Sequence, residues 1–199
     1  MFKKSLPLLI SLLATTAHAI TIPGLYAGLI VGEGYTNYTA STLGVPTSRD
    51  INTGIAGGIF GGYQFNNMIG GEIDFIRFPE ATFSNINNVT GVTGRIKESA
   101  IEFLLKGTTA VSNLGFNIVD MGFTASAKFG GAILYPRTEN LPANSTAPDS
   151  ARVRPVFGLG LGYEITPYLP LEISWTRIQS ESKTENADLI GLSLSYSFS

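Results

Sequence analysis

Large apolar side chains occupy every second position in several stretches of this chain, most regularly between residues 153 and 175. The alternating apolar positions are Val153, Phe157, Leu159, Leu161 and Tyr163, followed by Leu169, Leu171, Ile173 and Trp175. Because a period of two places alternate side chains on opposite faces of a strand, this segment predicts two strands joined by a short turn. The second face carries glycine and charge, which is typical of the interior of a small membrane barrel.

The same alternation predicts eight strands along the chain, at residues 24–35, 53–65, 68–78, 95–109, 116–135, 152–164, 168–178 and 187–198. Long polar connections at 36–51, 79–94 and 136–151 and a shorter one at 179–186 alternate with tight turns. Long extracellular loops and short periplasmic turns are the pattern of outer-membrane proteins, and each strand is long enough to cross a bilayer when tilted. We therefore predict an all-β fold, an eight-stranded antiparallel up-and-down transmembrane β-barrel.

Charged side chains on the predicted inner face form a candidate lumen network. They are Glu72, Asp74, Glu98, Glu102, Lys106, Lys128, Arg154 and Glu172. Charges in a narrow, poorly hydrated lumen must pair with one another or hold water. The first interpretation is a structural network that fills the barrel, and the second is a plug in which Glu72 and Lys106 exchange partners and pass small ions.

Aromatic residues gather near the predicted strand ends, where a membrane barrel carries its interfacial girdles. The predicted girdle comprises Tyr63, Phe65, Phe78, Tyr135, Tyr163, Tyr168, Trp175, Tyr196 and Phe198.

The first 19 residues have the three parts of a secretory signal: Lys3 and Lys4, an apolar run from Leu6 to Thr16, and the cleavage site Ala17-His18-Ala19. We predict cleavage after Ala19 and a barrel domain at 20–199. Loss of the two lysines changes the net charge from −2 to −4, which argues against nucleic-acid binding. With no cysteine, and its one histidine at position 18, the mature chain offers no His/Cys metal site, no cofactor site and no catalytic triad.

Several motifs together resemble the OmpA-type transmembrane barrel family. The segments 58–66 and 71–75 resemble its second hairpin, Leu105-Lys106-Gly107 and 128–131 its fourth and fifth strands, and 156–176 its sixth and seventh. The resemblance covers nearly all of the mature chain. It implies a barrel in the bacterial outer membrane with a central internal gate of four charged residues.

Three features depart from that family. The chain ends directly after the predicted barrel, without the peptidoglycan-binding domain of full-length members, and its last residue is Ser199 rather than an aromatic. Glu72 and Lys106 match two of the gate positions, whereas the other acidic position falls on Gly162 and the arginine position falls near Pro170.

The resemblance implies a non-enzymatic outer-membrane protein, a monomer or weak oligomer in lipid. Its expected role is structural or surface interaction: envelope integrity, and adhesion or host contact through the loops, with outer-membrane lipid, lipopolysaccharide and host-surface molecules as expected partners. One alternative is a porin-like pore for small solutes or ions, or a transporter of hydrophobic compounds. Another is a soluble, lipocalin-like carrier, whose polarity would be the reverse of that assigned here.

Overall fold

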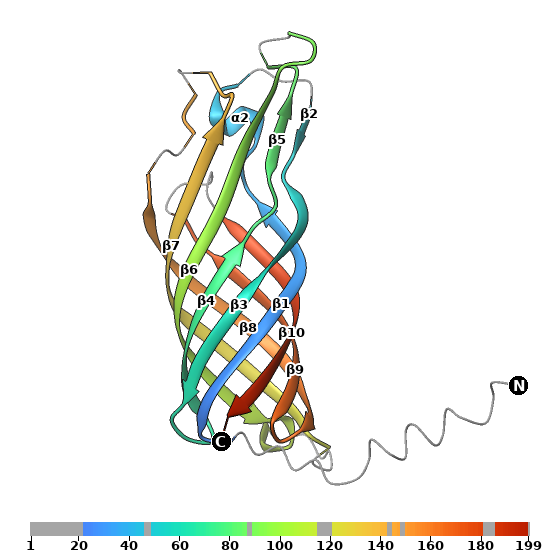
Figure 1. Ribbon diagram of the computed structural model, residues 1–199, viewed down its shortest axis with the longest axis vertical. Coiled ribbons are helices and arrows are strands. Elements are labelled where there is room, and N and C mark those ends of the chain that lie inside the picture. The colour runs from blue at the N-terminus through green and yellow to red at the C-terminus, as the bar shows by residue number, and fades with distance from the viewer. Residues whose placement is uncertain are drawn as a thin grey trace, which may run out of the picture.

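Eight long antiparallel strands close into a tilted barrel in the computed structural model, which describes residues 22–45, 49–86, 89–114, 121–142, 145–147, 150–180 and 186–198 (Figure 1). They are β1 (Gly24–Thr36), β3 (Thr53–Gln64), β4 (Ile69–Arg77), β6 (Thr93–Ala110), β7 (Phe123–Glu139), β8 (Arg152–Thr166), β9 (Leu169–Ile178) and β10 (Ala187–Phe198). Pairing of β1 with β10, from Leu25 opposite Phe198 to Thr36 opposite Ala187, closes the cylinder. The predicted fold class is confirmed, and closure leaves the barrel wall without a free sheet edge in the bilayer.

Most strands begin and end within two residues of their predicted bounds. The main exception is the strand predicted at 116–135, because β7 begins at Phe123 and continues to Glu139. Residues 116–120 of that prediction, like the predicted signal segment 1–19, lie outside the described residues. No helix in the described ranges is long and apolar enough to cross a membrane.

The outer face of the barrel wall is apolar. Large apolar side chains that are 55–83% exposed lie on β3, β4, β7, β8 and β10, among them Ile55, Ile59, Ile73, Phe129, Leu159 and Ile190. Such a continuous exposed belt is costly in water and is what a lipid-embedded barrel requires. The predicted polarity, with apolar side chains outward and Glu72, Lys106 and Glu172 inward, is the one that the structure has.

The upper half of the lumen, nearer the long loops, differs from the predicted polar interior. Its side chains form an apolar cluster that includes Ile30, Phe60, Ile76, Phe78, Ala100, Leu104, Leu134, Val156, Ile178 and Leu189. Phe78, predicted for the girdle, therefore points into the barrel, where it is 4% exposed. The upper half of the lumen therefore combines this apolar cluster with the buried acids Asp74, Glu98 and Glu102, whereas the prediction was a polar interior throughout.

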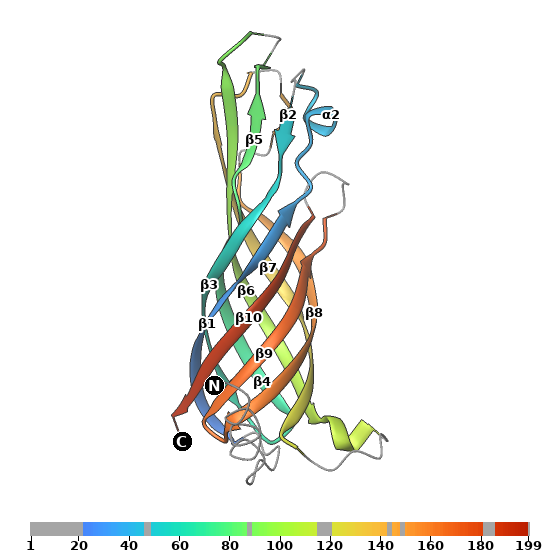
Figure 2. The same cartoon turned by 90° about the vertical axis from the view of Figure 1, so that its right-hand side faces the viewer.

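The three long loops were predicted to be polar connections without secondary structure, but the structure shows folded elements in this region. They contain α2 (Ala40–Leu43), β2 (Arg49–Ile51) and β5 (Ala81–Ser84), and β2 pairs with β5, which pairs with the extended end of β6. Together with the ends of β6 and β7 they form a lobe that rises above the barrel on one side (Figure 2). We call this part the extracellular lobe, since long loops of outer-membrane barrels face the exterior.

Candidate functional site

Four charged side chains meet in the lower half of the lumen, and we call them the charge ring: Glu72 on β4, Lys106 on β6, Lys128 on β7 and Glu172 on β9. The Lys106 Nζ atom lies 3.0 Å from Glu172 Oε2 and 4.0 Å from Glu72 Oε2. The Lys128 Nζ atom donates a short hydrogen bond to Glu72 Oε1 and lies 3.8 Å from Glu172 Oε1. Each lysine thus contacts both carboxylates, and the ring has no net charge.

The strand register brings two lysines of the charge ring together, and two carboxylates are needed to neutralise them. Lys106 and Lys128 are directly opposite each other on β6 and β7, an arrangement that is unfavourable for like charges. Glu72 and Glu172 reach them from β4 and β9 and separate the two positive charges. Gly160 leaves the necessary room, because a Cβ atom at that position would lie 2.9 Å from Glu172 Cδ.

A hydroxyl group donates to one oxygen of each carboxylate. Tyr26 donates a 2.9 Å hydrogen bond to Glu72 Oε2, and Ser126 donates one of 2.9 Å to Glu172 Oε2. Lys128 also lies over the Phe60 ring, 5.7 Å from its centroid. Buried charges are stable only when paired and hydrogen-bonded in this way. Neither Tyr26 nor Ser126 was predicted as a site residue, although both lie on the inner face of their strands.

The remaining predicted lumen residues lie above the ring. Asp74 and Glu102 are buried directly opposite each other on β4 and β6, one step closer to the apolar cluster. Glu98 and Arg154 lie farther up, at the mouth, and take no part in the ring: Glu98 accepts a 3.0 Å hydrogen bond from Tyr38, and Arg154 donates one of 3.2 Å to the carbonyl of Val153.

The ring corrects one part of the family-based prediction. Matching by motif left the second acidic position on Gly162 and the second cation near Pro170. In the structure, Glu172 supplies the second carboxylate and Lys128, on β7, supplies the second cation. The ring is complete with a lysine in place of the expected arginine.

A small polar cavity of about 60 Å³ lies in the lumen below the ring. It is lined by Tyr26, Gln64, Lys106, Thr108, Glu164, Glu172, Ser193, Ser195 and Ser197, among others. Above the ring, the lumen holds first the buried acids Asp74 and Glu102 and then the apolar cluster. A solute entering from the periplasmic end therefore meets the charge ring, then Asp74 and Glu102, and then the apolar cluster. The described residues hold no group of three or more His, Asp or Glu side chains suited to a metal ion.

The aromatic residues of the predicted girdle lie on the outer face, apart from Phe78. At the periplasmic end Tyr63 packs on Phe65, Phe123 on Tyr163 and Tyr196 on Phe198, with ring centroids 5.1–5.6 Å apart, and Tyr168 is 42% exposed nearby. Tyr135 and Trp175 lie toward the opposite end, where the Trp175 indole donates a 3.1 Å hydrogen bond to Asp188 Oδ1. Aromatic residues at both ends of the belt mark the two membrane interfaces.

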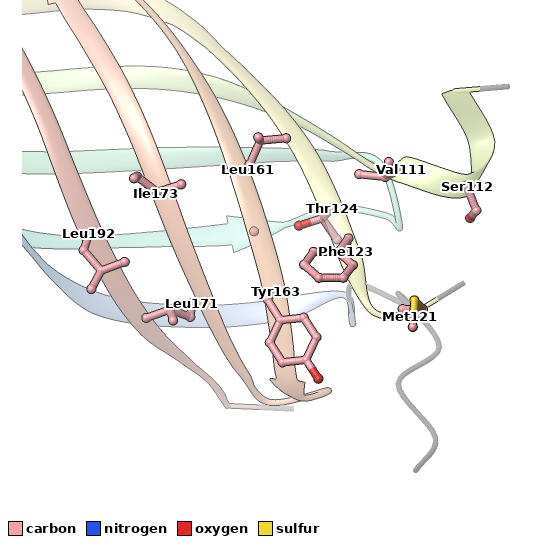
Figure 3. Close-up of a pocket in the computed structure, with 11 residues that line it drawn as sticks. Val111, Ser112, Met121, Phe123, Thr124, Leu161, Tyr163, Leu171, Ile173 and Leu192 are labelled. Carbon is pink, nitrogen blue, oxygen red and sulfur yellow. The ribbon is translucent and has the colours of Figure 1, made fainter. Parts of the chain in front are cut away.

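An outward-facing recess of about 480 Å³ opens near the periplasmic end (Figure 3). Its walls come from β7 to β10 and from the short 3-10 helix η2 (Val111–Leu114), and they include Met121, Phe123, Leu161, Tyr163 and Leu192. Because this recess is part of the apolar belt, it faces lipid rather than the lumen.

The extracellular lobe has a hydrophobic core of its own, separate from the barrel. It comprises Tyr38, Leu43, Val45, Ala81, Phe83, Ile86 and Ile96, with Ala40, Leu141 and Ala147 packed against it. All three long loops contribute, and a 3.2 Å hydrogen bond from the Thr146 amide to the Leu43 carbonyl joins the third loop to the first. Burial and the Glu98 carboxylate raise the pKa of the Tyr38 phenol, which stays protonated and donates to Glu98.

Comparison with known proteins decides the family. The model of the OmpA-like transmembrane domain matches residues 23–199. The chain belongs to the OmpA-like transmembrane domain family. Outer membrane protein A of Shigella flexneri is 28% identical over 152 residues, which cover 72% of this chain and 40% of that protein. An uncharacterized protein of Coxiella burnetii is 25% identical over 195 residues, covering 84% and 78%.

Solved structures agree on the fold of this OmpA-like domain. Neisserial surface protein A has a TM-score of 0.54 at 13% identity, covering 88% of this chain and 97% of that one. The outer membrane protein OprG from Pseudomonas aeruginosa has a TM-score of 0.57 at 12% identity, with the same coverage. The chain is thus an outer-membrane β-barrel of bacteria, as predicted. It spans 40% of the length of the outer membrane protein A sequence that it matches.

Proposed function

We propose that this OmpA-like barrel is a closed membrane anchor that presents an ordered extracellular lobe, and that its role is structural and surface-interacting rather than solute transport. The packing of the three long loops around Phe83 and its neighbours is the observation that carries this proposal. Loops with a shared core hold their surface in one arrangement, and binding surfaces gain affinity when they do not have to be ordered on contact. Host-surface molecules are the proposed partners of the lobe.

The contents of the lumen support the closed state. The charge ring joins β4, β6, β7 and β9 across the lower lumen, and Ile76, Phe78 and Leu104 belong to the apolar cluster above it. An ion would have to break buried ion pairs and then cross an apolar layer, both of which are unfavourable. An eight-stranded barrel has an interior that side chains can fill completely.

A second candidate function is a gated ion pathway, in which Glu72 and Lys106 would exchange partners and pass small ions. It is favoured by the polar cavity that reaches Lys106 and Glu172 from below, and by the unequal distances of 3.0 and 4.0 Å from Lys106 to the two carboxylates. A shift of Lys106 toward Glu72 would exchange its main partner. The apolar cluster above the ring argues against continuous passage.

One pair of measurements separates these functions. In planar bilayers the wild-type protein is expected to give no stepwise currents, and Lys106→Ala is expected to leave this unchanged. Fluorescent vesicles carrying the wild type are expected to be retained on epithelial cells at least tenfold better than vesicles carrying Phe83→Ala, whose lobe core is disrupted. Currents that depend on Lys106 would establish the gated pathway instead, and equal retention of both vesicles would exclude the lobe as the binding surface.

A further inference from the structure

Two buried acids lie in the lumen just above the charge ring without a base of their own. Asp74 on β4 is 6% exposed, Glu102 on β6 is 1% exposed, and the two residues are directly opposite each other. Like charges in this arrangement repel each other. Among the residues that the structure describes, neither acid forms an ion pair with a lysine or an arginine.

The charges in this part of the lumen do not balance. The charge ring has two bases and two carboxylates, which cancel. Asp74 and Glu102 would add a charge of −2 if both were ionised. An unpaired buried charge is so unfavourable that a carboxyl group in this position takes up a proton instead.

The neighbouring strands supply little compensating charge. Phe60 on β3 lies opposite Asp74, and Ala132 on β7 lies opposite Glu102. The charged ring residues that act on both acids are Glu72 and Lys128, and Lys128 already contacts both carboxylates of the ring.

The other titratable groups near the two acids also have partners elsewhere. Below the acids are Tyr26, Lys106 and Glu172, and above them are Tyr38, Glu98 and Arg154. Tyr26 donates to Glu72, Lys106 pairs with Glu172, Tyr38 donates to Glu98, and Arg154 donates to the carbonyl of Val153.

A contact between two acids indicates where one proton is held. The side chains of Asp74 and Glu72 are in hydrogen-bond contact, and ionised carboxylates can only accept, so one of the two must carry a proton. Glu72 accepts hydrogen bonds from Lys128 and Tyr26 on its two oxygens, which stabilises its ionised form. A proton on Asp74 satisfies the contact, with Asp74 as the donor. The Oδ1 atom of Asp74 has no hydrogen-bond partner in the described structure, as suits a neutral acid better than a carboxylate.

We propose that Asp74 and Glu102 form a proton-binding site in which each acid carries one proton at neutral pH. A metal cation suits the pair less well, because the described residues offer no group of three or more carboxylates for it and the cation Lys128 lies nearby. Release of the two protons would leave two negative charges beside Lys128 and would draw this lysine away from Glu72. The site is therefore a pH-sensitive element of the closed lumen, which goes beyond the proposed function.

Infrared spectroscopy of the intact protein in vesicles tests the site, because a protonated carboxyl group has a C=O stretching band distinct from the bands of a carboxylate. At neutral pH the wild type is expected to show this band. Asp74→Asn and Glu102→Gln are each expected to lose a share of it, and the double variant is expected to lose both shares. Glu139→Gln is the matched control, because Glu139 lies outside the lumen in a 2.8 Å ion pair with Lys97, and it is expected to leave the band unchanged.

The pH dependence of unfolding gives a second readout. Asp74 and Glu102 ionise at about pH 4 in an unfolded chain, so unfolding at neutral pH releases the protons that the native protein holds, and a higher pH favours unfolding. One such proton raises the unfolding equilibrium constant about tenfold per pH unit. From about pH 6 to about pH 8 the constant is expected to rise at least 100-fold more in the wild type than in Asp74→Asn/Glu102→Gln.

Three results would overturn the proposal. They are an infrared band that is the same in the wild type and the double variant, an equal pH dependence of their unfolding, and a wild type that lacks the band but is stabilised by added sodium or potassium ions. The third result would assign a metal cation to the pair instead of protons. Heat-modifiable gel mobility shows that each variant is folded. Neither bilayer currents nor cell retention enters these tests, so their failure is distinct from failure of the closed-anchor function.

Discussion

Replacing Lys128 by methionine is expected to lower the free energy of unfolding of the barrel by about 3–5 kcal/mol, the cost of breaking a buried ion pair from one side. Lys128 is 8% exposed and contacts both Glu72 and Glu172. Its loss leaves two buried carboxylates with Lys106 as the one remaining cation of the charge ring. Urea unfolding in liposomes, followed through the fluorescence of Trp175, the single tryptophan, measures the change.

Lys97→Met is the matched control, because Lys97 lies on the outer face in ion pairs with Glu80 and Glu139 that are open to solvent. Such exposed pairs contribute about 0–1 kcal/mol. The double variant Lys128→Met/Glu72→Gln is expected to recover part of the loss, since it removes an uncompensated charge as well. If Lys128→Met costs no more than Lys97→Met, the charge ring does not hold the barrel together.

Replacing Phe83 by alanine is expected to destabilise the extracellular lobe by about 3–5 kcal/mol while the barrel stays folded. Phe83 is fully buried in the lobe core and does not belong to the apolar cluster in the barrel. Limited proteolysis of the protein in vesicles is the measurement: cleavage within the lobe is expected to become at least 100-fold faster, with heat-modifiable mobility of the barrel retained.

Val89→Ala is the control for this change, because Val89 lies in the same loop and is 53% exposed. It is expected to leave the cleavage rate within twofold of the wild type. Unchanged proteolysis in Phe83→Ala would show that the three loops do not share a core. Loss of heat-modifiable mobility would show instead that the lobe and the barrel fold as one unit.

The barrel strands could be predicted from the sequence because lipid exposure gives a strong signal with a period of two. The run from Ile190 to Phe198 places every large side chain outward and glycine or serine inward. That pattern follows from backbone geometry alone and needs no knowledge of which strand is the neighbour. The identity of the inward charges followed from the same rule.

The partners of those charges could not be predicted, since they depend on the register between strands. Nothing near Lys128 in sequence shows that it lies opposite Lys106 or that Glu172 reaches both. The apolar cluster in the upper lumen was not predicted either, because its inward-facing residues lie within apolar stretches of the sequence. Leu104, which points inward, lies between the lipid-facing Phe103 and Leu105, and a continuous apolar run does not show which residue faces which way.

The extracellular lobe was missed because its core residues are dispersed. Tyr38, Phe83 and Ile96 are isolated apolar residues within polar or charged stretches, and they come together from two loops and the end of a strand. No local period marks them. A core assembled from single residues far apart in the chain becomes visible only once the strands that support it have been placed.

Apolar side chains of this protein face lipid, and charges face the axis of a closed barrel. Single cysteines labelled with nitroxide at positions 69 to 77 of β4, in a chain that has no other cysteine, report this arrangement residue by residue. We expect oxygen, which concentrates in lipid, to relax the labels at Ile69, Ile73 and Phe75, and neither oxygen nor a soluble nickel chelate to relax those at Glu72 and Asp74. Relaxation by oxygen at the even-numbered positions, or relaxation by nickel along the whole inner face, would show that the charges do not face the axis of a closed barrel.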